Sequence, residues 1–218
     1  MTKEERQKKL ENRLKEMKSF EYSYYEQGAK LIAGVDEVGR GPLAGPVVTA
    51  CVVLPRDFSV LGVDDSKKLS EKKREQLFDE ILENAICYGI GIEDNKVIDE
   101  INILEATKRA MTKAVAEADK KVDGKIDYVL FDAMKIDAVD KRQSSIIKGD
   151  AKSISIAAAS IVAKVTRDRM MIEYAKEYPY YAFESNKGYG TKAHYEGIEE
   201  HGITPIHRLT FLKNLDLK

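Results

Sequence analysis

The sequence contains no tryptophan, two cysteines, three histidines and five prolines in 218 residues. Cys51 and Cys87 are too few for a disulfide framework or for a zinc site built on cysteine, and the histidines lack the close spacing of zinc ligands. No apolar run is long enough to span a membrane, and the N-terminus is charged rather than signal-like. These absences exclude a membrane-spanning protein and favour the reducing cytoplasm.

A strong charge of one sign is also missing. Lysine and arginine total 36 against 37 for aspartate and glutamate, which gives a formal net charge of -1. This balance argues against a protein whose whole surface binds a polyanion, although a local basic groove remains compatible with it. Hydrophobic residues make up 43% of the chain, enough for a packed core.

The chain divides into a short polar extension and one large unit. Residues 1–28 are strongly polar, and Leu10, Leu14 and Met17 recur at helical spacing, so we predict an N-terminal surface helix. Residues 29–218 contain no repeat and no low-complexity linker, which indicates a single domain.

Within this domain, the hydrophobic pattern predicts five strands and three long helices. The strands are expected at residues 31–38, 47–54, 86–92, 126–131 and 145–147. Ser70 and Asn102 are suited to cap the first two helices, and the third is expected from Ser153 to Tyr174. Its small-residue run at 156–160 permits close packing on a sheet. This order of elements indicates an α/β layered fold with a mixed sheet.

Four acidic residues lie near the ends of predicted strands: Asp36, Glu37, Asp132 and Asp150. Carboxylates with apolar flanks are costly to bury unless they are paired or bind a cation. Any one of them alone is more often a helix cap or the partner of a lysine or arginine. The four together favour a site for Mg²⁺ or Mn²⁺, because these cations prefer oxygen ligands. Two such ions can promote phosphodiester cleavage.

The adjacency of Asp36 and Glu37 poses a geometric problem, because neighbours in a regular strand point to opposite faces. Both side chains can serve one site only if the strand ends, twists or bulges there. The alternative is that Glu37 contributes its backbone carbonyl. Glycines at positions 34 and 39 make a local distortion compatible with the sequence.

Several polar loops are candidates for substrate binding. Gly39, Arg40 and Gly41 follow the acid pair, and such a loop can bring backbone groups close to a ligand, although it can also be a plain turn. Backbone groups beside a ribose could read its 2′-hydroxyl, the group that separates RNA from DNA. A second loop carries Lys67 and Lys68, which are suited to contact phosphates or to remain solvated.

A third loop carries Tyr189, which could stack on a sugar or a base. Near the C-terminus, His207 and Arg208 form a candidate phosphate contact. The histidines at 194, 201 and 207 are individually more often structural.

These motifs, in this order, resemble those of the bacterial ribonuclease HII family, the type 2 ribonucleases H. The similar blocks are AGVDEVGRGPLAGPVV (33–48), DSKKLSEKKR (65–74), DEINILEAT (99–107), YVLFDAM (128–134), KGDAKSISIAAASIVAKVTRDR (148–169) and NKGYGTKAH (186–194). The resemblance spans roughly residues 30–211, and so many ordered blocks are very unlikely to match by chance.

The resemblance implies a ribonuclease H-like fold, a mixed five-stranded sheet flanked by helices with a helical C-terminal portion. It implies an endoribonuclease that cleaves the RNA strand of RNA–DNA hybrids and nicks 5′ to single ribonucleotides in duplex DNA, leaving 5′-phosphate and 3′-hydroxyl ends. Such an enzyme serves ribonucleotide excision repair, and a monomer is the family expectation. The implied metal ligands and catalytic residues are Asp36, Glu37, Asp132 and Asp150, with Mg²⁺ or Mn²⁺ as cofactor.

The resemblance also implies that Gly39, Arg40 and Gly41 sense the RNA–DNA junction and that Tyr189 stacks on a sugar. Lys67 and Lys68 match a substrate-facing region.

Three other functions share some of these features. Ribonuclease HIII has the same catalytic motifs but prefers longer RNA tracts and has an extra N-terminal domain, for which residues 1–28 are too short. An aspartyl-phosphate phosphatase also uses a strand-end aspartate with Mg²⁺, but it needs a second aspartate two residues on, where this sequence has Val38. A hybrid-binding module without catalysis is disfavoured because all four acids are present.

Overall fold

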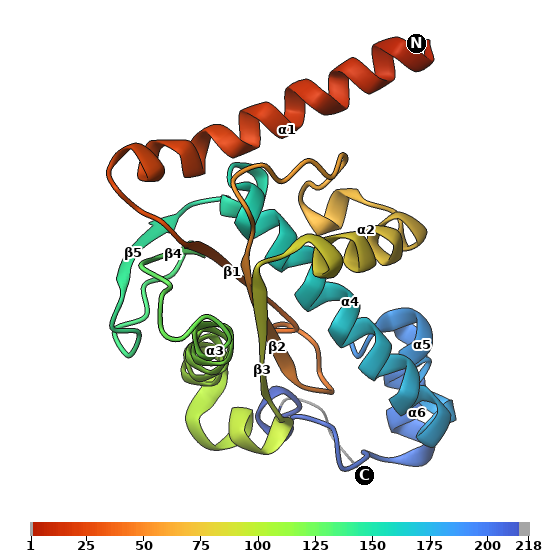
Figure 1. Cartoon of the computed structure of the whole chain (residues 1–218). Helices are drawn as coiled ribbons and strands as arrows, with labels where there is room; N and C mark the ends of the chain where they lie inside the picture. Colours follow the sequence, from red (N-terminus) through yellow and green to blue (C-terminus); the bar gives the residue numbers. More distant parts are fainter. Residues whose placement is uncertain (1, 214–218) are drawn as a thin grey trace.

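A mixed five-stranded sheet forms the centre of the molecule in a computed structural model, which describes residues 2–213 (Figure 1). The strands are β1 (Ile32–Val38), β2 (Val47–Val53), β3 (Cys87–Glu93), β4 (Tyr128–Asp132) and β5 (Arg142–Ile146). Their order is β3-β2-β1-β4-β5; β1 pairs antiparallel with β2 and β2 with β3, whereas β4 runs parallel to both β1 and β5. The predicted mixed sheet is confirmed, and β5 begins three residues earlier than predicted.

Helices cover both faces of this sheet. They are α1 (Lys3–Glu26), α2 (Glu71–Asn84), α3 (Asn95–Lys120), α4 (Ile154–Glu177), α5 (Phe183–Asn186) and α6 (Lys192–His201). Helix α3 covers one face, and α4, with α2 packed beside it, covers the other (Figure 1). α5, α6 and the short helix η4 (Leu209–Phe211) form the expected helical C-terminal portion, whose last predicted residues, 214–218, lie outside the described residues.

The predicted helix caps are present. The side chains of Ser70 and Ser153 accept hydrogen bonds from the first turns of α2 and α4. Asn102 accepts from the backbone N–H groups of Leu104 and Glu105, so it caps a helix as predicted. A further helical segment, capped by Asp94, precedes it, and Asn102 has a φ of 69° at the junction. This first helical segment was not predicted, because the apolar residues before Asn102 form too short a pattern to indicate a helix.

Helix α4 lies unusually close to the centre of the sheet because both surfaces are made of small residues. Ala157, Ala158 and Ala159 are fully buried, as the run at 156–160 predicted. A Cβ added to Gly34 of β1 would lie 2.1 Å from the backbone carbon of Ser155. Glycine is therefore required at this position, and the close approach brings the start of α4 against β1 two residues before Asp36.

The N-terminal helix α1 is largely exposed, as its polar sequence predicts, but two of its residues are buried against the domain. Met17 belongs to the same apolar cluster as the alanines of α4. The carboxylate of Glu21 accepts hydrogen bonds from the Ser153 hydroxyl at 2.5 Å and the Ser155 N–H at 3.0 Å, and burial raises the Glu21 pKa. Helix α1 is thus attached to the N-terminal end of α4.

Candidate active site

Strand register brings Asp36 and Asp132 together. Gly34 pairs with Leu130 in the parallel ladder between β1 and β4. Because side chains alternate along a strand, Asp36 and Asp132, two residues further on, lie side by side on the same face as Gly34. This is the face covered by α4. Asp36 lies inside β1, two residues before its end, whereas Asp132 is the last residue of β4.

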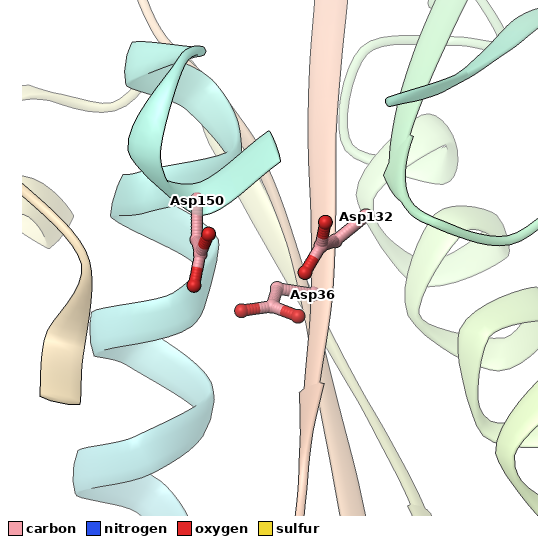
Figure 2. Close-up of side chains that lie close together, drawn as sticks. All are labelled: Asp36, Asp132 and Asp150. Atoms are coloured by element: carbon pink, nitrogen blue, oxygen red, sulfur yellow. The ribbon is translucent and has the colours of Figure 1, made fainter. Parts of the chain in front are cut away.

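Asp150 reaches the same place from a different element. It lies in the single turn η2 (Gly149–Ala151), which connects β5 to α4. The backbone N–H of Gly149 donates to Oδ1 of Asp132 at 2.8 Å, which attaches this turn to β4. One carboxylate oxygen from each of Asp36, Asp132 and Asp150 lies within 4.8 Å of the others, and the three side chains converge (Figure 2).

The three carboxylates repel one another in a largely buried setting. Asp36 is 7% exposed; burial raises its pKa well above the usual aspartate value, and the charges of Glu37, Asp132 and Asp150 raise it further. Burial and the nearby Asp65 and Asp132 also raise the pKa of Asp150. Among residues 2–213, no lysine or arginine forms an ion pair with any of the three. The interpretation of each acid as the partner of its own cation is therefore wrong for these three aspartates.

The donor set fits a divalent cation. Carboxylate oxygens that converge without a neutralising side chain are the ligands that Mg²⁺ and Mn²⁺ prefer, and a bound cation removes the repulsion among them.

Glu37 does not join this group. The antiparallel register is regular through Asp36–Ala50, Glu37–Thr49 and Val38–Val48, so β1 has no bulge at this point. Regular alternation directs the Glu37 side chain away from the face that carries Asp36, and its carboxylate forms an ion pair with Arg40 at 3.4 Å. Burial raises the Glu37 pKa against the opposing effect of Arg40. The local distortion that the glycines allowed is absent, and a metal-binding role for Glu37 stays a prediction.

The glycine loop and Tyr189 lie against each other beside the carboxylates. Gly39 has a φ of 91°, and a Cβ there would lie 2.2 Å from Nε of Arg167, so only glycine fits. A Cβ added to Gly41 would lie 3.7 Å from Cε1 of Tyr189, whose side chain is partly exposed. The structure thus brings together two groups that the sequence placed about 150 residues apart.

Comparison with known proteins is decisive at this point. The model of the family described as "Ribonuclease HII" matches residues 33–214. The chain belongs to the ribonuclease HII family. Ribonuclease HII of Enterococcus faecalis is 58% identical over 203 residues, which are 93% of this chain and 78% of that protein.

Solved structures agree. Ribonuclease H2 of Pyrococcus horikoshii superposes with a TM-score of 0.67 at 30% identity, covering 83% of this chain and 93% of that one. The complex of PCNA with ribonuclease HII from Archaeoglobus fulgidus gives 0.69 at 25% identity, covering 86% and 96%. The fold is therefore the ribonuclease H-like fold, and membership of the ribonuclease HII family makes the chain a nuclease. No helix within residues 2–213 has the length and apolar character needed to cross a membrane.

The two candidate lysines of this ribonuclease HII chain differ in their surroundings. Burial lowers the Lys67 pKa, but Asp150, Asp36 and further acidic charges outweigh this effect, and the pKa is raised overall. Lys67 thus interacts electrostatically with the aspartate cluster. The Lys68 ammonium instead lies 3.5 Å from the Asp64 carboxylate and 4.0 Å from that of Asp65. Lys67 is the stronger candidate for a group beside the reacting phosphate.

The predicted phosphate contact at His207 and Arg208 is wrong. Arg208 is fully buried, and its guanidinium donates to the carbonyls of Gly39 at 2.6 Å, Arg40 at 3.0 Å and Gly45 at 2.8 Å. His207 is 1% exposed and bonds to a second histidine. The sequence around this dipeptide does not indicate that the Arg208 guanidinium would donate its hydrogen bonds to backbone carbonyls of a distant loop.

Two further arginines were not singled out from the sequence. Arg167 of α4 is fully buried and donates to the carbonyls of Pro46, Lys187 and Ala44, so it joins the segment that follows the glycine loop to the loop that carries Tyr189. Arg13 of α1 makes two 3.0 Å hydrogen bonds to the Asp64 carboxylate and one of 2.8 Å to the carbonyl of Ala151. Helix α1 therefore contacts both the turn that carries Asp150 and the loop that carries Lys67. Polar spacing in a charged helix could not reveal these contacts.

Proposed function

We propose that this nuclease hydrolyses the RNA strand of RNA–DNA hybrids and nicks 5′ to single ribonucleotides embedded in duplex DNA, leaving 5′-phosphate and 3′-hydroxyl ends. The observation that carries the proposal is the convergence of Asp36, Asp132 and Asp150 next to a glycine loop in contact with Tyr189. Membership of the ribonuclease HII family supports the same substrate class.

Asp36, Asp132 and Asp150 would hold the Mg²⁺ or Mn²⁺ cofactor, and Glu37 would be an additional ligand through its side chain or its backbone carbonyl. When bound, two such ions supply an activated water on one side of the phosphate and neutralise the leaving 3′-oxygen on the other. The chain's own contribution is to fix the oxygens. Asp132 is oriented by the Gly149 N–H, and Asp36 by the Glu37 N–H at 2.8 Å.

Substrate choice is assigned to the loops beside this cluster. Gly39, Arg40 and Gly41 have backbone groups that can approach a ribose, and a hydrogen bond to its 2′-hydroxyl selects a ribonucleotide. Tyr189 packs on the neighbouring deoxynucleotide and so enforces the junction from RNA to DNA. Lys67, whose pKa the nearby aspartates raise, contacts the phosphate. The enzyme acts as a monomer in the cytoplasm, in ribonucleotide excision repair.

Cleavage mapping tests this proposal. An end-labelled duplex with one embedded ribonucleotide is incubated with the full chain, with and without Mg²⁺ or Mn²⁺, beside an all-DNA duplex and an RNA–DNA hybrid. We expect a single metal-dependent nick 5′ to the ribonucleotide, cleavage of the hybrid, and no cleavage of DNA. Cleavage of the hybrid without nicking of the single ribonucleotide would indicate ribonuclease HIII-like specificity and would contradict the proposal.

A further inference from the structure

Two buried histidines form a hydrogen-bonded chain whose direction is fixed at both ends by backbone groups. At one end, the Thr204 N–H donates to Nδ1 of His207 at 2.8 Å, and the Thr204 hydroxyl lies at the same distance and can donate to it as well. An N–H can only donate, so this Nδ1 carries no proton, and the proton of the neutral His207 ring lies on Nε2. At the other end, Nδ1 of His194 lies 2.9 Å from the carbonyl oxygen of Tyr189. A carbonyl can only accept, so His194 carries its proton on Nδ1.

The central contact is consistent with both ends. Nε2 of His207 lies 3.0 Å from Nε2 of His194, so the first nitrogen donates and the second accepts. A second proton on His194 would place N–H groups of the two rings opposite each other. A second proton on His207 would place its Nδ1–H opposite the Thr204 N–H. The rings are 1% and 0% exposed, and the aromatic rings of Tyr181 and Phe183 pack against them edge-on or tilted. Burial lowers the pKa of both histidines, that of His207 to about 4. Both rings are therefore neutral.

The hydrogen bonds of the two histidines end at the carbonyl of Tyr189, the residue assigned to the RNA–DNA junction. Tyr189 belongs to the loop whose Gly188 carbonyl accepts from the Leu43 N–H, so its backbone position also sets the distance between its ring and Gly41. The next residue after His207 acts on the other side of the same site. Arg208 donates to the carbonyls of Gly39 and Arg40. One dipeptide thus contacts both loops: Arg208 binds the glycine loop directly, and His207 reaches the tyrosine loop through His194.

We propose that His194 and His207 are positioning residues that fix Tyr189 relative to Gly41 and thereby set the preference for a single embedded ribonucleotide over a continuous RNA tract. This inference rests on the proposed function and deepens it. The histidines themselves do not touch the substrate. Their effect is transmitted through the Tyr189 carbonyl, so it alters the relative rates on two substrates more than cleavage in general.

The first test uses the wild-type protein. Nitrogen-15 NMR of the imidazole rings at pH 7 distinguishes the two neutral tautomers and the charged ring. We expect His194 with its proton on Nδ1 and His207 with its proton on Nε2, each as a single tautomer, and His201, which is exposed, as an averaged reference. A charged ring or the opposite tautomer at either buried position would contradict the proposed hydrogen bonds between the two histidines.

The second test compares variants by the ratio of kcat/KM on a duplex with one ribonucleotide to kcat/KM on an RNA–DNA hybrid. His194→Leu removes the donor to Tyr189 and should lower this ratio by about tenfold, as a misplaced contact does. His194→Asn keeps an N–H near the position of Nδ1 and should restore most of it. His201→Leu, on the same helix, should leave the ratio unchanged.

An unchanged ratio in His194→Leu, with only a lower melting temperature, would mean a purely structural role and would overturn the inference. If His194→Leu does not fold, His207→Leu, which removes the donor to Nε2 of His194, takes its place in the same comparison, and an unchanged ratio there would overturn the inference. Failure of the wild type to nick at a single ribonucleotide would instead contradict the proposed function. The tautomer measurement would still test the hydrogen bonds between the two histidines.

Discussion

The backbone N–H of Gly149 donates to Oδ1 of Asp132 at 2.8 Å. This one hydrogen bond joins the end of β4 to the turn that carries Asp150. Two carboxylates that would otherwise repel each other are therefore fixed close together by the backbone. This repulsion lowers the free energy of unfolding, and a bound divalent cation would offset it.

The two glycines of the junction loop should respond differently to alanine. Gly41→Ala adds a methyl group at an ordinary contact distance from Tyr189 and requires no unusual φ, so the free energy of unfolding should change by less than about 0.5 kcal/mol. Nicking at a single ribonucleotide should fall by about tenfold, because the backbone can no longer approach the ribose closely.

Gly39→Ala is the matched control. Its φ of 91° and the contact with Arg167 should cost about 2 kcal/mol or more of stability, measured by urea unfolding. Full nicking activity in Gly41→Ala would contradict the role assigned to this loop.

Arg13 should couple helix α1 to the active site. Arg13→Ala removes the hydrogen bonds to Asp64 and to the Ala151 carbonyl, which should lower the free energy of unfolding by about 1–2 kcal/mol. Because Ala151 follows Asp150, kcat should fall as well. Arg6→Ala, an exposed change on the same helix, should alter neither quantity. Equal kcat values for the two variants would show that α1 does not position Asp150.

The buried histidine pair should make stability depend on pH. An unfolded His207 takes up a proton near its ordinary pKa of 6.5, whereas in the folded protein burial, and then the neighbouring His194, lower that pKa to about 4. Between these values the unfolded state binds more protons, so folding loses stability as the pH falls from 6.5 toward 4. At pH 5 the loss is on the order of 2 kcal/mol.

His207→Gln cannot titrate at this position, so its free energy of unfolding should fall less between pH 7 and pH 5 than that of the wild type. Urea unfolding of both proteins at the two pH values checks this. Parallel losses would mean that His207 is not the group responsible.

Most of the fold followed from local patterns in the sequence. Alternating and β-branched runs located all five strands, and side chains such as Ser70 and Asn102 cap the helices for which they were predicted. The segment before Asn102 was missed because its helix is short and capped by Asp94 just after a strand. Strand β5 was predicted too short because its polar residues Arg142 and Gln143 lie at a sheet edge, where burial does not impose an apolar pattern.

The candidate site was predicted only in part, because residue types can be read from the sequence but the directions of their side chains cannot. Asp36, Asp132 and Asp150 were correctly predicted to converge, because strands that meet in one sheet bring their carboxyl halves together. The side of β1 on which Glu37 lies depends on whether the strand bulges, and only the pairing with β2 decides that. The role of Arg208 depended on carbonyls more than 160 residues away, which no local pattern contains.

The central claim is that Asp36, Asp132 and Asp150 form a divalent cation site, and Mn²⁺ binding tests it most directly. Electron paramagnetic resonance can follow a titration of the metal-free protein with Mn²⁺ in the absence of nucleic acid. The matched variants are Asp36→Asn and Asp79→Asn, the latter at an exposed aspartate on α2. Both keep the side-chain shape and remove one charge. The Glu37 N–H can still donate to the remaining oxygen at position 36, so the fold should persist.

We predict that the wild type and Asp79→Asn bind Mn²⁺ alike. Asp36→Asn should lose this binding and all metal-dependent cleavage, while its metal-free form should be at least about 1 kcal/mol more stable than the wild type, because one of the repelling charges is gone. Mn²⁺ binding and cleavage by Asp36→Asn at the wild-type level would contradict the account.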